Sequence, residues 1–303
     1  MAVSSSASRA WLNGLLGVAI FSGSLPATRV AVAQIDPFFL TSARACIAGL
    51  LALCILAAVR PARPRAQDWP GLALTALGVV VGFPLFTAFA LQHVTAARSL
   101  VFIGLLPLAT AVFGVLRGAE RPPAAFWLFA LAGSACVVAF ALTQDAGGTW
   151  RGDAWMLAAI LACGFGYAEG ARLSRHLGGW QVICWCLLLC LPAMALWCAF
   201  TRAPDWSQVG APARYALAYV SLFSMLIGFF FWYRGLAQGG IAAVGQLQLL
   251  QPFMGLGLAA GLLGEPVSGA MLLATAAVVA CVAGARRHAA APLVKPPSKT
   301  VQS

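Results

Sequence analysis

The sequence predicts an all-α integral membrane protein whose ten transmembrane helices form two inverted five-helix repeats. Three observations lead to this fold class. The 303 residues are 61% hydrophobic and only 9% charged, with a mean hydropathy of +0.89, whereas soluble domains are roughly half apolar and about a quarter charged. Apolar stretches long enough to cross a bilayer recur along the whole chain. Finally, residues of the first half of the chain recur in the second half at a fixed spacing.

Each predicted span is an apolar run of about 20 residues, the length that a helix needs to cross the hydrocarbon core. Short breaks that are polar or contain proline separate the runs. Pro84, in Gly82-Phe83-Pro84, is expected to kink the third span without ending it. The ten predicted spans are 11–33, 37–59, 70–91, 96–116, 124–143, 153–174, 180–200, 213–234, 242–263 and 267–285.

The basic residues gather on one side of the membrane when the N-terminus is placed in the cytoplasm. Thirteen then fall at cytoplasmic ends and loops, against Arg151, Arg202 and Arg214 outside. This bias predicts a multi-pass protein of the cytoplasmic (inner) membrane with both termini in the cytoplasm. It also explains the net charge of +11 without a nucleic-acid partner. The thirteen are Arg9, Arg60, Arg63, Arg65, Arg117, Arg121, Arg172, Arg175, Arg234, Arg286, Arg287, Lys295 and Lys299.

The nine cysteines all fall inside predicted spans, where cysteine packs as a small apolar residue. Cys184, Cys186 and Cys190 lie close together, but no histidine or carboxylate is near them in the sequence. A metal site is therefore not expected there. No cofactor is expected either.

A register of 145 residues aligns the two halves of the chain. It brings Pro107 onto Pro252 and Glu120 onto Glu265, and in each copy the glutamate follows the proline by thirteen positions. The predicted halves are 1–147 and 148–288, followed by a cytoplasmic tail at 289–303. Because five is an odd number of helices, the second half enters the membrane from the opposite side. The register therefore predicts an inverted repeat.

The end of each half carries the pattern L-x5-A-x9-P-x12-E, and Arg44 closes "DPFFLTSAR" in the second span. Together with "GGIAAVGQLQLLQPFMGLGLAAGLLGEP" in the ninth span, these motifs resemble the EamA family of the drug/metabolite transporter superfamily, the ten-helix permeases. The resemblance covers nearly the whole chain. It implies secondary transport of small metabolites or amino-acid-like compounds by alternating access, with export as the expected direction. The implied partners are a small-molecule substrate and the lipid bilayer, while proton coupling and a homodimer are left open.

Glu169 is the one acidic residue well inside a predicted span, in "GFGYAEGARLSR". A carboxylate at such depth is costly, so it generally faces a partner, a cavity or water. Glu169 is therefore a candidate for substrate binding or proton coupling. The alternative is a structural ion pair with Arg172 or Arg234, which lie at a similar predicted depth.

Gln248 and Gln251 lie three residues apart in the ninth span, about 60° apart around an α-helix, while Gln246 points elsewhere. Two adjacent amides supply donors and acceptors without a fixed charge, which suits an amphipathic substrate. Both are therefore expected to face the cavity between the halves. Interhelical hydrogen bonding is the alternative role.

Arg44 lies about 10 Å below the outer surface, seven residues into its span. As the arginine that matches the family, it is a candidate for binding an anionic group of the substrate. The alternative is that it holds the helix bundle through backbone carbonyls or Asp36. Trp232 and Tyr233, in "FFFWYR", are candidates for lining the cavity, with the aromatic belt at the membrane interface as the alternative.

A membrane-embedded enzyme and a channel are the competing functions. The sequence has no H-E-x-x-H, no G-x-S-x-G and no paired aspartates within the spans, so no enzyme is expected. An inverted repeat with few polar residues at depth favours alternating access over a continuous hydrated pore.

Overall fold

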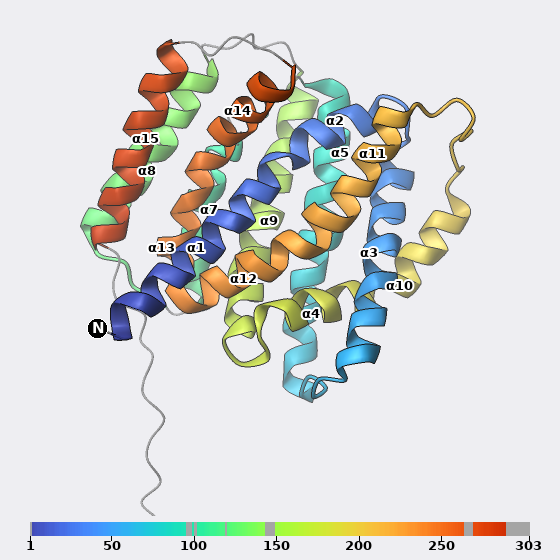
Figure 1. Ribbon diagram of the computed structural model, residues 1–303, viewed down its shortest axis with the longest axis horizontal. Helices are drawn as coiled ribbons and strands as arrows, with labels where there is room; N and C mark the ends of the chain where they lie inside the picture. Colours follow the sequence, from blue (N-terminus) through green and yellow to red (C-terminus); the bar gives the residue numbers. More distant parts are fainter. Residues whose placement is uncertain are drawn as a thin grey trace, which may run out of the picture.

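The computed structural model describes residues 2–94, 99, 102–118, 120–142, 149–263 and 269–288, and the regular elements among these residues are all helices (Figure 1). Glu265 and the predicted tail at 289–303 fall outside the described residues. The elements are α1 (Ala2–Ser22), α2 (Ser24–Val32), α3 (Pro37–Val59), the 3₁₀ turn η1 (Ala66–Asp68), α4 (Trp69–Ala76), the π-helical η2 (Leu77–Gly82), α5 (Phe83–His93), α7 (Leu106–Gly118), α8 (Ala124–Leu142), α9 (Trp150–Leu177), α10 (Gly179–Phe200), α11 (Ala211–Tyr219), the π-helical η3 (Val220–Ile227), α12 (Gly228–Gly239), α13 (Ile241–Gly245), the 3₁₀ segment η4 (Gln246–Leu250), α14 (Gln251–Leu263) and α15 (Gly269–His288).

Six helical stretches among the described residues are long and apolar enough to cross a membrane, and each coincides with a predicted span. The other four predicted spans fall on shorter helices: α7, α8, α13 with α14, and α15. The third stretch runs through Pro84 without ending, as expected. The six are Ser8–Val32, Pro37–Val59, Ala66–His93, Trp150–Leu177, Gly179–Phe200 and Ala211–Gly239.

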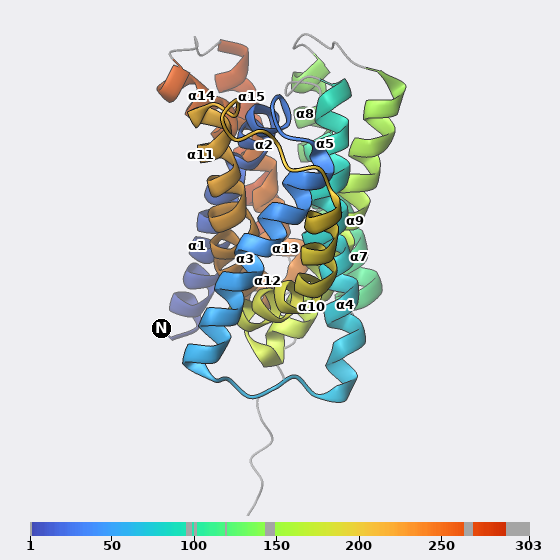
Figure 2. The same cartoon turned by 90° about the vertical axis from the view of Figure 1, so that its right-hand side faces the viewer.

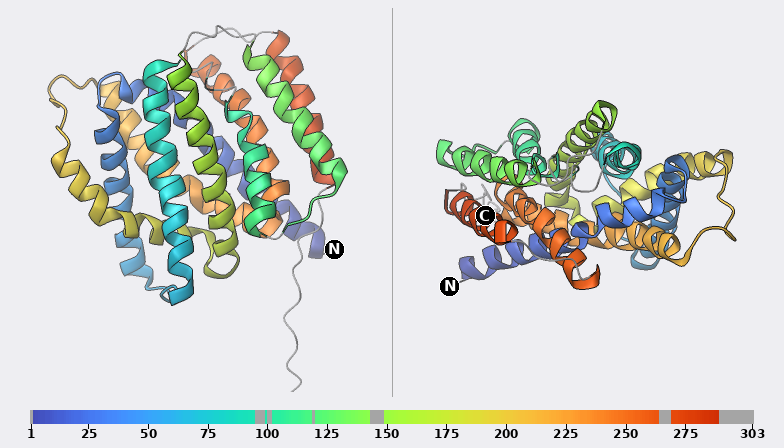
Figure 3. Two further views of the ribbon diagram at one scale, coloured as in Figure 1. Left: turned by 180° about the vertical axis from the view of Figure 1, so that it is seen from behind. Right: turned by 90° about the horizontal axis from the view of Figure 1, so that it is seen from above.

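The helices form one bundle in which the two parts of the chain interleave (Figures 1 and 2). α1 packs along α12, α3 along α10 and α8 along α15, and α9 packs against both α5 and α7. Figure 3 shows α9 between α5 and α7 on the rear face of the bundle. Each of these contacts joins an element before residue 148 to an element after it, so the two parts share the main hydrophobic core of the described residues.

Pro107 and Pro252 each occupy the second position of a helix, since α7 begins at Leu106 and α14 at Gln251. These two starting residues are equivalent in the 145-residue register. A proline has no N–H to donate to the carbonyl four residues before it, so an α-helix is interrupted there. In the second copy the chain tightens into η4 instead, and the Gln251 N–H donates to the carbonyl of Gln248.

The two π-helical segments are equivalent in the same register. At the end of η2 the N–H of Phe83 donates to the carbonyl of Gly78, and at the end of η3 the N–H of Gly228 donates to the carbonyl of Phe223. Shifting the first bond by 145 residues gives the second. Because π-helical segments occur frequently at functional sites, they direct attention to the region between η2 and η3.

An aromatic cluster fills the middle of the bundle next to these segments. The ring of Phe21 lies 5.1 Å from that of Phe229 and 6.3 Å from that of Tyr167. Glycine lets η2 approach α9 closely, because a Cβ on Gly78 would lie only 2.6 Å from the carbonyl oxygen of Ala162. The cluster and this close helix contact together enclose a small interior pocket.

Candidate functional site

The interior pocket is enclosed by elements from both parts of the chain. Its volume is about 20 Å³, little more than the space that one water needs. Any larger ligand therefore requires the surrounding helices to move apart. The pocket is lined by Phe21, Ser24, Leu25, Arg44, Val79, Phe83, Pro84, Leu106, Tyr167, Ser224, Met225, Phe229 and Gln251.

Arg44 of α3 lies beside this pocket and is 4% exposed. Its Nη2 donates to the carbonyl of Val220 at 3.0 Å and to Oγ of Ser224 at 3.2 Å, while its Nε has no partner among the described residues. Asp36 caps the start of α3 by accepting from backbone N–H groups, and no described carboxylate pairs with Arg44. The Val220 contact fits the structural alternative for Arg44, but no carboxylate among the described residues neutralises its charge.

Gln251 reaches the same pocket from the first residue of α14. Its Nε2 donates to the carbonyl of Phe21 at 3.4 Å, and its Oε1 has no partner among the described residues although the side chain is buried. Ser24 donates to Ser224 at 2.7 Å on the pocket wall. The same buried pocket is thus lined by a guanidinium, an amide and two hydroxyl groups, which belong to Arg44, Gln251, Ser24 and Ser224.

Gln248 and Gln246 are fully buried but do not line the pocket. The Oε1 of Gln248 accepts from Oγ1 of Thr110 on α7 at 3.4 Å, which is the interhelical hydrogen bond that the alternative role predicts. Neither polar atom of the Gln246 side chain has a partner among the described residues. Of the two predicted cavity glutamines, the structure brings only Gln251 to Arg44.

Trp232 and Tyr233 are fully buried, so neither belongs to an aromatic belt at the membrane interface. The belt alternative does not fit, because α12 packs against α1 and α9 and these helices contribute to the burial of both rings. Tyr233 donates to the carbonyl of Gly166 at 3.2 Å, and the ring of Trp232 lies 5.4 Å from that of Tyr167. Neither side chain lines the pocket.

Glu169 is fully buried and lies away from the pocket, in an ion-pair network with two arginines. Its Oε2 accepts from Nε of Arg117 at 3.0 Å, and its Oε1 accepts from Nη2 of Arg172 at 2.5 Å. Arg172 was one of the two partners considered, whereas Arg234 makes no ion pair with it among the described contacts. These contacts favour the ion-pair alternative over direct substrate binding.

Glu120 has a structural role that the sequence did not reveal. Its two carboxylate oxygens accept from the N–H groups of Ile241 and Ala242 at 2.7 and 2.8 Å, and Oε1 also accepts from Arg175 at 3.0 Å. A carboxylate at a helix N-terminus satisfies free N–H groups and is favoured by the helix dipole. Glu120, which the 145-residue register aligns with Glu265, therefore holds the start of α13 against the end of α9.

The comparisons with known proteins agree with this architecture. The model of the EamA-like transporter family matches twice, at residues 8–142 and 150–286. The chain belongs to the EamA-like transporter family. With its apolar helices, this membership makes it a multi-pass membrane protein of a transporter family.

Relatives of this EamA-like transporter carry transporter names. Over 279 residues it is 62% identical to the "Uncharacterized transporter YdeK" of Bacillus subtilis, covering 92% of this chain and 97% of the relative. Over 263 residues it is 27% identical to the "Probable terminal-alkyne amino-acid exporter" of Streptantibioticus cattleyicolor, covering 83% and 84%. A solved crystal structure superposes with a TM-score of 0.75 at 23% identity, covering 93% of this chain and 98% of that one, which shows the fold alone.

Proposed function

We propose that this transporter is a secondary exporter of amino-acid-like metabolites that works by alternating access in the cytoplasmic membrane. Ten spans in two inverted units, 1–147 and 148–288, surround one central substrate site, and both termini and the tail at 289–303 lie in the cytoplasm. The basic side chains on one side of the membrane support this orientation. The name of the amino-acid exporter relative supports both the substrate class and the direction.

The inverted repeat is supported by three structural features that recur at the same spacing. These features are the starts of α7 and α14, the bonds that end η2 and η3, and the paired contacts of α1 with α12 and of α9 with α5. The pocket follows the same relation, because Val79 and Ser224 line it from register-equivalent positions, as do Leu106 and Gln251. A site on the pseudo-two-fold axis is accessible in turn from both sides of the membrane.

The observation that carries the substrate class is that Arg44, which no described carboxylate neutralises, lines the same pocket as Gln251, whose Oε1 has no partner among the described residues. A guanidinium binds a carboxylate through strong charge-assisted hydrogen bonds, and an amide oxygen accepts from an ammonium group. The α-carboxylate and α-ammonium of an amino acid supply these two groups. Phe21, Tyr167 and Phe229 then provide an apolar wall for its side chain.

The polar side-chain contacts toward the end of α9 provide the closure on the cytoplasmic side in this proposal. Glu169 connects α9 to α7 through Arg117, and Asp68 connects η1 to α9 through His176 at 3.0 Å. Opening toward the cytoplasm requires these contacts to separate. Glu169 therefore acts in the conformational change and does not contact the substrate.

Proteoliposomes containing the purified protein test the proposal. Vesicles are loaded with a mixture of L-amino acids, and efflux is measured with and without an imposed proton gradient. We expect saturable efflux of chemically unchanged amino acids with apolar side chains. Vesicles loaded with the same mixture but lacking the protein should show no such efflux. Efflux that does not saturate would indicate a channel, and chemical conversion of the solutes would indicate an enzyme; either result would refute the proposal.

A further inference from the structure

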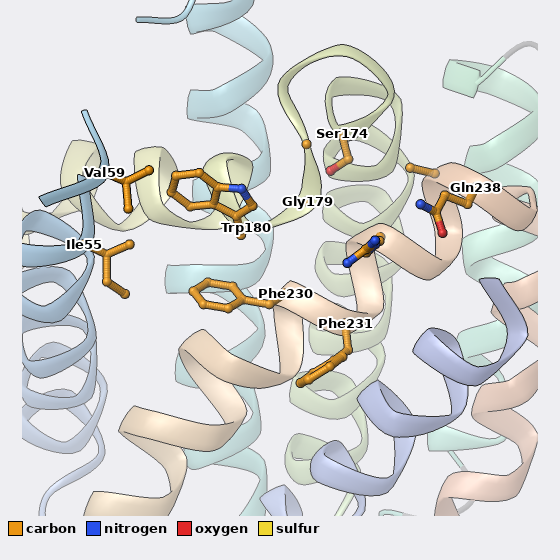
Figure 4. Close-up of a pocket in the computed structure, with 11 residues that line it drawn as sticks. Ile55, Val59, Ser174, Gly179, Trp180, Phe230, Phe231 and Gln238 are labelled. Atoms are coloured by element: carbon orange, nitrogen blue, oxygen red, sulfur yellow. The ribbon is translucent and has the colours of Figure 1, made fainter. Parts of the chain in front are cut away.

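A second cavity forms a lateral groove between the end of α3, the start of α10 and α12 (Figure 4). Its volume is about 740 Å³, and it shares no lining residue with the central pocket. A cavity of this size accommodates a small-molecule ligand. The groove is lined by Ile55, Val59, Ser174, Gly178, Gly179, Trp180, Phe230, Phe231, Arg234, Ala237 and Gln238.

The groove has an apolar end and a polar end. In Figure 4 the rings of Trp180 and Phe230 lie between the α3 side chains Ile55 and Val59 on one side and Gln238 on the other. Val59 is 58% exposed, so the apolar end of the groove is open at the outer surface of the bundle. Such a gradient matches an amphiphile whose hydrocarbon chain lies against α3 and α12.

The polar end carries a positive charge that no described carboxylate neutralises. Arg234 lines the groove and is exposed, and it forms none of the ion pairs found among the described residues. On the adjacent α9, by contrast, Arg172 and Arg175 each pair with a glutamate. The α10 N-terminus at Gly179 also borders the groove and lacks a side-chain cap, so its free N–H groups add to the attraction for an anion.

The equivalent place at the opposite end of the bundle has different chemistry. The register puts Phe89 at the position of Arg234, and the ring of Phe38, the second residue of α3, lies 4.8 Å from Phe89 and 5.6 Å from Trp197. At the opposite end, aromatic rings thus pack together at the position that corresponds to the Arg234 guanidinium in the groove. The guanidinium of Arg234 therefore has no counterpart at the register-equivalent position, and in the proposed orientation it lies on the cytoplasmic side.

We infer that this groove binds an anionic phospholipid of the cytoplasmic leaflet. The lipid phosphate lies at Arg234 and the α10 N-terminus, and one acyl chain runs along Ile55, Val59 and Phe230. The cytoplasmic leaflet is where anionic lipids are concentrated, and basic pockets between transmembrane helices on that side suit their headgroups. The inference depends on the proposed orientation of the chain but not on the substrate or on the direction of transport.

Native mass spectrometry of the full-length protein in detergent tests this site, with phosphatidylglycerol or phosphatidylcholine added. We expect phosphatidylglycerol to bind more tightly, and Arg234→Gln to weaken its binding about fivefold. Ile55→Trp, which fills the apolar end, should reduce binding of the same lipid. Arg287→Gln removes an exposed arginine outside the groove and is the matched control; its binding should equal that of the unsubstituted protein.

Three outcomes would overturn the inference. These are equal affinity for the two lipids, phosphatidylglycerol binding that Arg234→Gln leaves unchanged, and an equal loss in Arg287→Gln. Because the assay measures lipid binding without flux, its failure is distinguishable from a failure of the proposed transport function.

Discussion

Replacing Glu169 with glutamine removes a buried negative charge that two arginines share. The carboxylate is fully buried, whereas the side chains of Arg117 and Arg172 are 41% and 43% exposed. Breaking a fully buried ion pair costs about 3–5 kcal/mol, and an exposed pair contributes about 0–1 kcal/mol. Because both guanidinium groups can turn toward solvent, and glutamine keeps an acceptor for one of them, we expect a cost of about 1–2 kcal/mol.

The assay combines thermal unfolding in detergent with substrate binding to the same preparation. Glu169→Gln should lower the melting temperature by roughly 2–6 °C and leave substrate affinity unchanged, because Glu169 does not line the central pocket. Arg172→Gln is the matched control, and it should cost less because Arg117 still pairs with the carboxylate. Unchanged stability with lost substrate binding would show instead that Glu169 binds the substrate.

Three further predictions concern other parts of the fold. Gln246→Leu should leave thermal stability unchanged or raise it, because both polar atoms of this buried side chain lack partners among the described residues. A decrease in unfolding free energy above about 2 kcal/mol would show that Gln246 makes a stabilising hydrogen bond. Gly170→Ala should lower stability by about 1–3 kcal/mol, since the added Cβ would lie 2.3 Å from the Tyr233 ring, and unchanged unfolding would contradict that crowding. A cysteine at Gln208 should react with an impermeant maleimide in intact cells and one at Ala62 should not; the reverse pattern would invert the proposed topology.

The predicted spans 96–116 and 242–263 run through Pro107 and Pro252, whereas the structure begins a new helix at each of them because proline interrupts an α-helix locally. Pro107 and Pro252 mark the starts of α7 and α14, whatever packs against them. Pro252 also shows why the directions in which the side chains of the ninth span point were harder to predict. The 60° separation of Gln248 and Gln251 assumes α geometry, but the chain before Pro252 is a 3₁₀ segment, and Gln248 contacts Thr110 while Gln251 faces the pocket.

The contacts between distant segments could not be predicted from one sequence. Glu169 pairs with Arg117, which is 52 residues away, and Glu120 caps a helix 121 residues later. Periodicity indicates which face of a helix is buried but not which helix covers it. Ser224, which contacts Arg44, likewise carries no sequence signal beyond being a serine in an apolar span.

In the proposed function, Arg44 binds the carboxylate of the substrate. Binding of an exported amino acid and of its methyl ester is measured by thermal stabilisation of the unsubstituted protein, Arg44→Lys and Arg44→Gln, with Arg151→Gln as an exposed control. The unsubstituted protein and the control should prefer the acid roughly 10- to 100-fold, as expected for a charge-assisted hydrogen bond. Arg44→Lys should keep part of this preference and Arg44→Gln should lose it. An undiminished preference for the acid in Arg44→Gln would show that Arg44 does not bind the carboxylate.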